Sequence, residues 1–368
     1  MISQTLDRVL SGPAWKWKAL LLVLGISLFR AFPAYDALAT PHSQATFQNM
    51  QFQIDHLPCD MGRLFPPGSH ESKLTFRLTV PIIARLLHLR ATGLLILYGI
   101  AGLALLYMAI SLSEKITASR QVAFFILLTI ACTWPGETSF HELYGGVYDG
   151  IALCFLLLAL RTESALFAGS CVFLAAWTEE RALIASAFLL LFWFSADPRG
   201  WKRPIAVLAA WSGYIAVRLI LAHSYSLTVA TGNLGLPVLE SHIALIPVGI
   251  WTGLGGAWIV VAGSLFVLLR RRKYWLAAGF CGLLGVTIAG ALLVMDVTRT
   301  MAYCLPAVFV ALRVLMRCGS AGHLDKLAKI SAAASVLAPT FFVLGNMLLY
   351  LYPLPLEIIR WLRHIPLT

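Results

Sequence analysis

The chain has 368 residues, of which 59% are hydrophobic and only 12% are charged, and its mean hydropathy is +0.81. This composition excludes a soluble domain, because a water-facing surface needs far more charge. The apolar segments run unbroken instead of alternating in short stretches, which indicates membrane-spanning helices and not a barrel. The chain is therefore expected to be an integral membrane protein.

A helix needs roughly 20 apolar residues to cross a bilayer, so this length allows on the order of ten crossings plus loops. We predict an all-α polytopic membrane protein with about 11 transmembrane helices in a single transmembrane domain over residues 1–368. In chain order, the predicted spans are 18–34, 92–112, 121–135, 148–161, 164–178, 182–196, 205–222, 243–269, 275–295, 300–316 and 330–352.

The lysines and arginines are distributed unevenly among the loops between these spans. With a cytoplasmic N-terminus most of them fall in inner loops, so the net charge of +11 reflects orientation by the positive-inside rule. The charge gives no support to a nucleic-acid partner, for which basic residues would cluster with aromatic residues on a solvated face. Most acids, and all histidines except His323, fall on the outer side. We therefore expect the chemistry at the extracytoplasmic face.

The first outer loop, residues 32–90, is the longest segment between predicted spans. In 44–57 the apolar residues recur at spacings of three and four, which predicts an amphipathic helix in the membrane interface. These residues are Phe47, Met50, Ile54 and Leu57. The segment 72–89 is either a second interfacial helix or a short re-entrant one. The C-terminal segment 353–368 is expected to lie flat on the outer leaflet.

Two aspartates at span ends are candidates for chemistry. Asp36 follows the outer end of the first predicted span, where water and a lipid-borne substrate both reach. Its carboxylate is either a general base or a solvated loop residue or helix cap. Asp149 leads directly into the apolar run 151–160. It either caps that helix or acts with Asp36 around a shared substrate or cation, and both roles can hold together.

Two charged turns lie at the outer ends of later spans. One turn, made of Glu179, Glu180 and Arg181, joins two spans with almost no loop. If Arg181 pairs with one of the two glutamates, the other still needs a partner. A solvated position in a charged hairpin turn accounts for one of these glutamates more readily than for both. Asp296 and Arg299 are spaced either for a structural ion pair on one helix or for Arg299 to hold phosphate oxygens bidentately.

Motifs for several other chemistries are missing from the sequence. The outer histidines show no HxxxH or HExxH spacing, which gives little support to a zinc hydrolase. No GxSxG, SxxK or Cys–His signature places a nucleophile, and no P-loop or GxGxxG cradles a nucleotide. An enzyme of this kind must take its activated substrate from the membrane.

The layout resembles the type-C integral-membrane glycosyltransferases (GT-C), which use polyprenyl-phosphate-linked sugars as donors. In that superfamily an acid follows the first span, and a long outer loop with interfacial helices comes next, often with a Pro-Pro element; Asp36 and Pro66-Pro67 are similar here. The segment 145–160, with its Gly-x-x-x-Asp-Gly entry to a Leu-rich span, is similar to the segment before the family's fourth crossing. Arg299 ahead of Pro306 is similar to the late arginine that contacts the donor phosphate.

The resemblance implies a glycosyltransferase on the outer face of a bacterial-type inner membrane. It would move a sugar from a polyprenyl-phosphate donor to a glycan, lipid or protein acceptor, with inversion at the anomeric centre. A divalent cation, Mg²⁺ or Mn²⁺, could take part, with no ligands assigned. The residues predicted for the site are Asp36 as the catalytic base, Asp149, Glu180 and His141 to orient substrate, and Arg299, Lys73 and Arg77 to bind the donor phosphate.

Other functions remain open from the sequence. A transporter or lipid flippase predicts charges near the bilayer midplane and interrupted helices, yet almost every ionisable residue lies near a span end, with Arg218 and Arg313 as candidate exceptions. A polysaccharide polymerase or ligase would share the outer loop but usually has its largest loop late in the chain. An acyltransferase or peptidase comes last, because no His or Ser constellation supports it.

Overall fold

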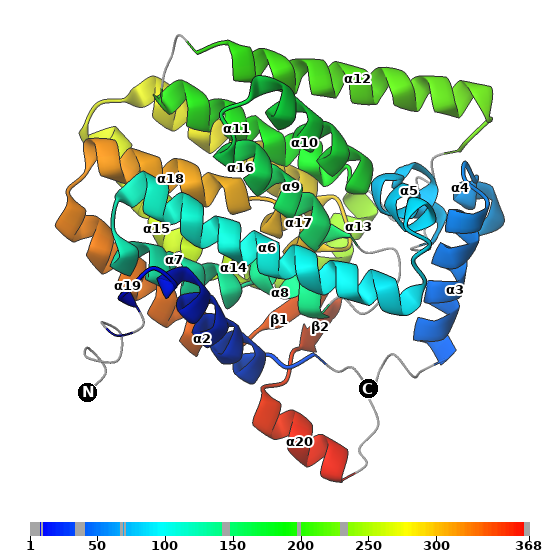
Figure 1. Cartoon of the computed structure of the whole chain (residues 1–368), viewed down its shortest axis with the longest axis horizontal. Helices are drawn as coiled ribbons and strands as arrows, with labels where there is room; N and C mark the ends of the chain where they lie inside the picture. Colours follow the sequence, from blue (N-terminus) through cyan, green and yellow to red (C-terminus); the bar gives the residue numbers. More distant parts are fainter. Residues whose placement is uncertain are drawn as a thin grey trace.

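In the computed structural model the chain is mostly helical, and its helices pack into one bundle (Figure 1). Among the residues that the structure describes, five helices are long and apolar enough to cross a membrane, or six if one bent pair is counted as a single span. The prediction of an all-α membrane protein therefore holds at this coarse level, while the number of 11 spans stays a prediction. The structure describes residues 8, 10–33, 41–66, 69, 71–141, 148–196, 200–228 and 235–363.

The helices of the first part of the bundle follow the predicted spans closely, because unbroken apolar runs are the strongest signal in a membrane sequence. One of them departs from the prediction: α7 bends by 59° into α8, so the predicted span 121–135 continues as a second short helix. The helices are α2 (Trp15–Arg30), α6 (Ala91–Thr117), α7 (Arg120–Ala131), α8 (Trp134–His141), α9 (Asp149–Arg161), α10 (Ala165–Thr178), α11 (Arg181–Ala196) and α12 (Lys202–Ser224).

The later helices are more interrupted than predicted. The predicted span 243–269 is broken at Gly255, whose backbone φ of +50° ends α14 before α15 begins. The predicted span 330–352 is wrong in its second half, where β1 and β2 form an antiparallel hairpin with Phe341 opposite Tyr350. The elements are α13 (Leu236–His242), η3 (Ile243–Leu245), α14 (Ile246–Leu254), α15 (Ala257–Arg270), α16 (Tyr274–Leu292), α17 (Val297–Ala302), α18 (Leu305–Cys318), α19 (Ala321–Leu337), β1 (Phe341–Leu344), β2 (Met347–Tyr350) and α20 (Leu354–Leu362).

The long loop 32–90 is largely helical, and its first helix packs on the protein. The predicted apolar stripe is present in α3, but Met50 and Ile54 are buried against Val80, Leu94 and Tyr98 of the following elements. The bundle itself covers much of this stripe, and the location of α3 in the membrane interface stays a prediction. The elements of this loop are α3 (Pro41–Asp55), α4 (Met61–Leu64), η2 (Glu71–Phe76) and α5 (Thr79–Leu86).

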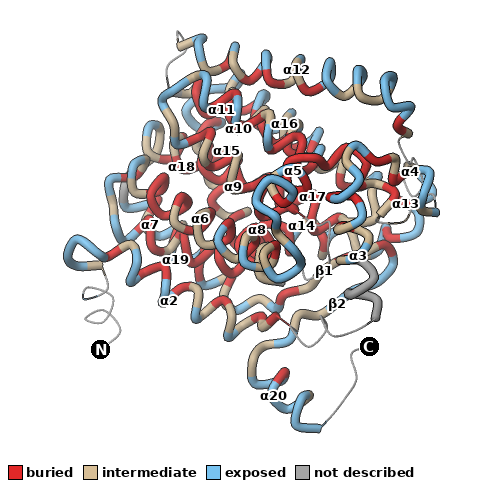
Figure 2. Tube along the Cα trace, turned by 45° about the vertical axis from the view of Figure 1, so that its right-hand side comes forward, coloured by how far each residue is buried: buried red, intermediate tan, exposed pale blue. Residues whose placement is uncertain are grey.

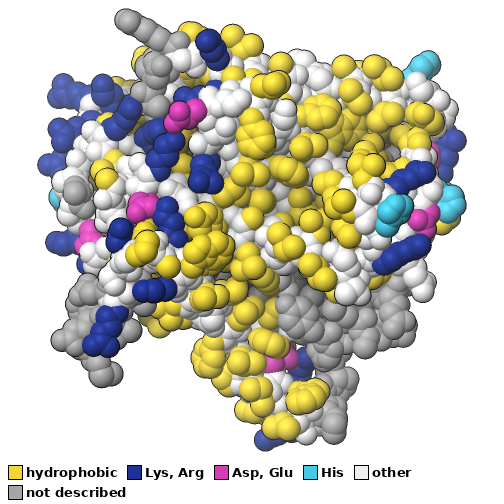
Figure 3. Space-filling model, viewed as in Figure 1, with side chains coloured by type: hydrophobic (Ala, Val, Ile, Leu, Met, Phe, Trp, Pro, Cys, Tyr) yellow, Lys and Arg dark blue, Asp and Glu magenta, His cyan; other side chains and the backbone are white. Residues whose placement is uncertain are grey.

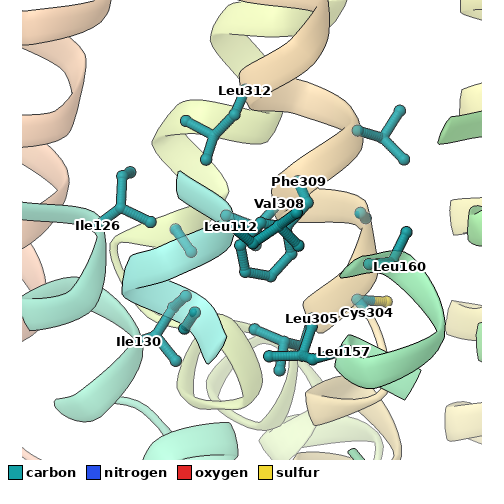
Figure 4. Packing of buried hydrophobic residues seen from close by; sticks show 14 of the residues in the cluster. Leu112, Ile126, Ile130, Leu157, Leu160, Cys304, Leu305, Val308, Phe309 and Leu312 are labelled. Carbon is teal, nitrogen blue, oxygen red and sulfur yellow. The ribbon is translucent and has the colours of Figure 1, made fainter. Parts of the chain in front are cut away.

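Helix α18 is the centre of the bundle. In an apolar stretch of 18 residues within Val297–Cys318, 78% of the residues are buried, whereas the share in the corresponding stretch of α12 is 17%. Helix α12 lies at the periphery, with an exposed outer side (Figure 2). Phe309 of α18 is fully buried, and apolar side chains from α6, α7 and α9 surround it (Figure 4). Close packing of this kind fixes the positions of the helix ends that carry the charged residues.

The helices place charged residues at two opposite ends of the bundle. At one end α2 begins, α6 and α9 finish and α10 begins; we call this the basic end, because Lys and Arg side chains crowd the left of the molecule there (Figures 1 and 3). Helix α9 runs from Asp149 at the opposite end to Arg161 at the basic end, roughly 20 Å away by its length.

Candidate functional site

A short buried helix, α17, carries Arg299 into the interior at the end opposite the basic end. Its neighbour α14 approaches closely because it has glycine at the contact: a Cβ on Gly253 would lie 2.3 Å from the Cβ of Met301. The Oγ1 atoms of Thr252 and Thr298 are 3.1 Å apart and join the same two helices. α17 is therefore fixed on one side by α14.

The β-hairpin fixes α17 from another direction. The backbone N–H of Val343 in β1 donates to Oγ1 of Thr298 at 3.1 Å, and the N–H of Gly345 donates to the carbonyl of Met295 at 2.8 Å. These bonds satisfy backbone groups that an isolated hairpin inside an apolar bundle would leave unpaired. Arg299 is thus presented by a helix with little freedom to rotate.

Asp149 meets Arg299 at the start of α9. The Arg299 Nε donates to Oδ2 of Asp149 at 2.6 Å, and the Tyr303 hydroxyl donates to Oδ1 at 2.7 Å. The side chain of Asp149 is fully buried. Tyr148, and not Asp149, is the N-cap residue of α9, and it makes no side-chain cap bond. The alternative that Asp149 caps this helix is therefore wrong, although the carboxylate still lies in the first turn, where the helix dipole favours it.

Glycine next to Asp149 lets α8 approach α9. A Cβ on Gly150 would lie 1.7 Å from the Oγ of Ser139, so no larger residue fits without moving α8. Gly150, which follows Asp149 in the sequence motif, is therefore needed for the close packing of α8 on α9. It sets the distance at which the start of α9, and with it the Asp149 carboxylate, sits in the bundle.

A second buried pair joins the long loop to the bundle. Arg77 follows η2 and holds Glu179, the residue after α10, with both terminal nitrogens: Nη1 lies 2.9 Å from Oε2, and Nη2 donates to Oε1 at 3.2 Å. Both side chains are almost fully buried. The hydroxyl of Thr79 donates to the carbonyl of Leu174 at 2.8 Å and ties the same two segments together.

Longer contacts link the two pairs into one charge cluster. Arg299 Nη1 donates to Oδ2 of Asp296 at 2.9 Å, and its Nη2 lies 3.8 Å from Oε2 of Glu179. Arg181 lies 3.5 Å from Asp296 and 3.9 Å from Glu179. Three acids thus face three arginines, which offsets the cost of removing six charges from water. The charge cluster consists of Arg77, Asp149, Glu179, Arg181, Asp296 and Arg299.

Lys73 lies at the edge of this cluster. Burial, and beyond it the charges of Arg77, Arg181 and Arg299, lower the pKa of Lys73, while Asp296 opposes them. Within the described part of the chain, its ammonium makes no hydrogen bond or ion pair. Lys73 is partly exposed and, unlike the arginines of the cluster, is not held by a carboxylate of the described residues, so a ligand can reach it without displacing an acid.

A tyrosine hydroxyl near the cluster also lacks a partner among the described residues. The hydroxyl of Tyr148 is buried and has no hydrogen-bond partner among the residues that the structure describes. Its ring packs edge-on against Tyr98, with centroids 6.1 Å apart. A buried polar group without a partner is costly, which makes this hydroxyl a candidate for ligand contact.

The structure brings together part of the predicted site. Arg299, Arg77 and Asp149 belong to one charge cluster, and Lys73 lies beside it. Glu180 is separate, because its side chain is 44% exposed and pairs with Arg218. Asp36 and the side chain of His141 lie outside the described residues. The predicted roles of all these residues stay predictions.

No site role is predicted from the sequence for Glu179, Arg181, Asp296 or Tyr303. For the glutamates the signal was present but ambiguous, since Glu179 and Glu180 are adjacent and only tertiary packing decides which of them is buried. Asp296 and Arg299 form the predicted ion pair at helical spacing. The ion-pair alternative is therefore observed, the pair belongs to a larger cluster, and the phosphate-binding role of Arg299 stays a prediction.

A further buried acid was also missed. Glu137 of α8 is fully buried and ion-paired with Arg30, the last residue of α2. Arg30 Nη1 also donates to the carbonyl of Ala338 at 2.7 Å, which ties the end of α2 to the segment before the hairpin. Glu137 follows Pro135 and Gly136, and these two residues were the sequence signal for the bend that places it.

Metal ligands do not gather among the described residues, where no group of three or more His, Cys, Asp and Glu side chains is placed to hold an ion. The acids of the charge cluster are held by arginines. A cation role for Mg²⁺ or Mn²⁺ therefore stays a prediction.

Comparison with known proteins returned no matching family model, no matching curated protein and no matching solved structure.

Proposed function

We propose that the protein is a membrane glycosyltransferase that moves a sugar from a polyprenyl-phosphate donor to a glycan, lipid or protein acceptor. The observation that supports this most is the gathering of Lys73 and three arginines at one end of a bundle of apolar helices. A phosphate leaving group needs strong charge stabilisation, which preorganised cations in a water-poor site supply. A donor with a polyprenyl chain would reach such a site from the membrane.

The proposed reaction transfers the sugar in one displacement. The oxygen of the acceptor hydroxyl attacks the anomeric carbon, its proton passes to the carboxylate of Asp36, and the bond from carbon to the phosphate oxygen breaks with its electron pair on the phosphate. Attack from the face opposite the phosphate inverts the anomeric centre. The base must accept one proton, and the cations must stabilise one additional negative charge on the leaving group.

The geometry divides the predicted phosphate-binding residues into two kinds. Arg77 and Arg299 are buried and already hold carboxylates, so their contribution is a fixed positive field. Lys73 is the cation that can contact the phosphate directly, because no carboxylate of the described chain occupies it. Direct contact by an arginine would require it to exchange a carboxylate for the phosphate.

The residues proposed to orient substrate act in different ways. Asp149 is not exposed, so it positions Arg299 and Tyr303 and does not touch substrate. Glu180 is exposed enough to contact a sugar hydroxyl while paired with Arg218. His141 is kept in the proposal from its place in the sequence alone. The proposed location is the outer face of a bacterial-type inner membrane, with the N-terminus cytoplasmic.

A specific observation also favours a second candidate, a transporter or lipid flippase. Interrupted helices and buried charges are features of transporter substrate sites. Here α7 bends by 59° into α8, α14 breaks from α15 at Gly255, and the charge cluster lies inside the bundle. The charges are paired with one another, however, and pairing leaves no empty charged site for a transported ion in the described cluster.

An assay of the full-length protein in detergent micelles, which have no sealed interior, distinguishes the two candidate functions. Purified protein in detergent micelles is given synthetic polyprenyl-phosphate hexoses or pentoses and a membrane glycan extract, and transfer of label is measured. A glycosyltransferase turns over in micelles, whereas a transporter acts only in sealed proteoliposomes. Label movement across sealed vesicles without transfer in micelles would overturn the proposal.

Variants then test the roles of single residues. We expect Asp36→Asn and Lys73→Met each to lower the turnover number by about 10²-fold or more, since each removes a group that acts in the transition state. Arg90→Gln is the matched control: Arg90 is a 74% exposed cation of the same loop, and its loss should leave transfer unchanged. Unchanged transfer by Asp36→Asn would remove Asp36 as the base.

A further inference from the structure

A cavity of about 690 Å³ opens at the basic end, far from the charge cluster. Four helix ends form it: the start of α2, the ends of α6 and α9 and the start of α10. Its volume is in the range of sites that bind small molecules or lipid headgroups. The residues that matter for its chemistry are Lys16, Glu114, Lys115, Arg161, Glu163 and Phe167.

The charges that line this cavity do not cancel. Lys16 pairs with Glu114 at 2.7 Å, and Lys115 pairs with Glu163 at 3.1 Å. Arg161 is exposed and has no hydrogen-bond or ion-pair partner in the described ranges of the chain. Three cations therefore face two acids, and the guanidinium in excess is the group best shaped to bind phosphate oxygens bidentately.

The wall beside these charges is apolar and aromatic. Phe167 lines the cavity and is 48% exposed, and the preceding Leu166 is 81% exposed. Nearby on α2, Trp17 stacks on Tyr107 with ring centroids 4.9 Å apart. Trp and Tyr at the end of apolar helices are typical of the membrane–water interface. A ligand here would meet charge on one side and an acyl-chain environment on the other.

We propose that this cavity binds the phosphate-bearing headgroup of an anionic phospholipid, with Arg161 holding the phosphate and the acyl chains lying along Leu166 and Phe167. Lys16 and Lys115 line the same cavity, where each is paired with an acid, so the charge in excess is that of Arg161. The site is independent of the proposed sugar transfer. Free phosphate shares the recognised chemistry but lacks the chains, so the two sources give different results.

The test uses native mass spectrometry of the full-length protein in a neutral detergent. Phosphatidylglycerol and phosphatidylcholine with matched chains are titrated separately, and inorganic phosphate is added as a competitor. We expect wild type to bind phosphatidylglycerol at least about 5-fold more tightly than phosphatidylcholine, since one basic residue at an anionic surface contributes about that factor. Millimolar phosphate should leave the lipid bound.

Three variants complete the design. Arg161→Gln should remove most of the preference for phosphatidylglycerol, and Arg161→Lys, which keeps the charge but not the bidentate fork, should give an intermediate value. Arg270 is an exposed arginine at the end of α15 that does not line the cavity, so the Arg270→Gln variant should bind both lipids as wild type does. Equal affinity for the two lipids, an unchanged preference in Arg161→Gln and Arg161→Lys, or displacement of the lipid by phosphate would each overturn the proposal.

Discussion

The pair of Asp149 and Arg299 makes a quantitative prediction about stability. The Asp149 side chain is fully buried and accepts one bond from Arg299 and one from Tyr303. Asp149→Asn would remove one carboxylate that compensates the buried charge of Arg299, and among the described residues Asp296 and the more distant Glu179 would still face it. Removing one partner of a buried ion pair costs about 3–5 kcal/mol, so we expect that loss in the free energy of unfolding.

The reverse change should cost a similar amount. Arg299→Gln leaves the Asp149 carboxylate buried with Tyr303 as its remaining described donor. In the double variant neither charge remains unpaired, so its cost should be smaller than the sum of the two single costs by about 0.5–3 kcal/mol. Unfolding in SDS micelles, followed by labelling of buried thiols such as Cys171, gives these free energies.

A surface pair of similar length supplies the control. Lys329 and Asp325 are 2.7 Å apart on α19, but their side chains are 44% and 30% exposed. Asp325→Asn should cost at most about 1 kcal/mol, as exposed ion pairs do. The two pairs differ mainly in burial, so a loss in Asp149→Asn no larger than in Asp325→Asn would show that water reaches the charge cluster and would refute the reasoning.

Two further predictions concern the same end of the bundle. Gly253→Val places a side chain where even a Cβ lies 2.3 Å from Met301, so it should lower the free energy of unfolding by at least about 1–3 kcal/mol, whereas Gly282→Val, with open space around it, should not. Because burial and the nearby arginines lower the pKa of Lys73, the unfolded chain holds that proton more tightly than the folded one. Lys73→Met should therefore raise the free energy of unfolding near neutral pH, and this gain should shrink as the pH rises toward the ordinary lysine pKa of about 10.5. A difference between variant and wild type in SDS unfolding that stays constant over that pH range would contradict this account.

Much of the helical architecture follows from the sequence, because unbroken apolar runs and charged ends determine where most helices lie. The hairpin does not follow from the sequence for the same reason: 341–350 is apolar, and an apolar run predicts the end of a span. Its turn signal was the pair Gly345-Asn346, and Gly345 adopts a φ of +56°. A composition that suits both a buried strand and a buried helix cannot decide between them.

The candidate site was predictable only in part, since its pairs join residues far apart in the chain. Arg77 and Glu179 are 102 positions apart, and Asp149 and Arg299 are 150 apart. The sequence indicates that charges at span ends need partners, but not which ones. Glu179 is buried and Glu180 exposed because the backbone direction at the end of α10 turns the first toward Arg77 and leaves the second beside Arg218.

The length of α9 explains why the charge cluster is so fully paired. Its 13 residues span roughly 20 Å, which is less than the hydrocarbon thickness of about 30 Å. If the basic end lies at one headgroup layer, Asp149 lies below the opposite layer, where unpaired charge is expensive. The three acids and three arginines then satisfy one another, and Lys73 at the edge is the group that we propose to meet a phosphate carried in by the lipid. This arrangement predicts that Lys73→Met separates function from stability, lowering sugar transfer while raising resistance to unfolding.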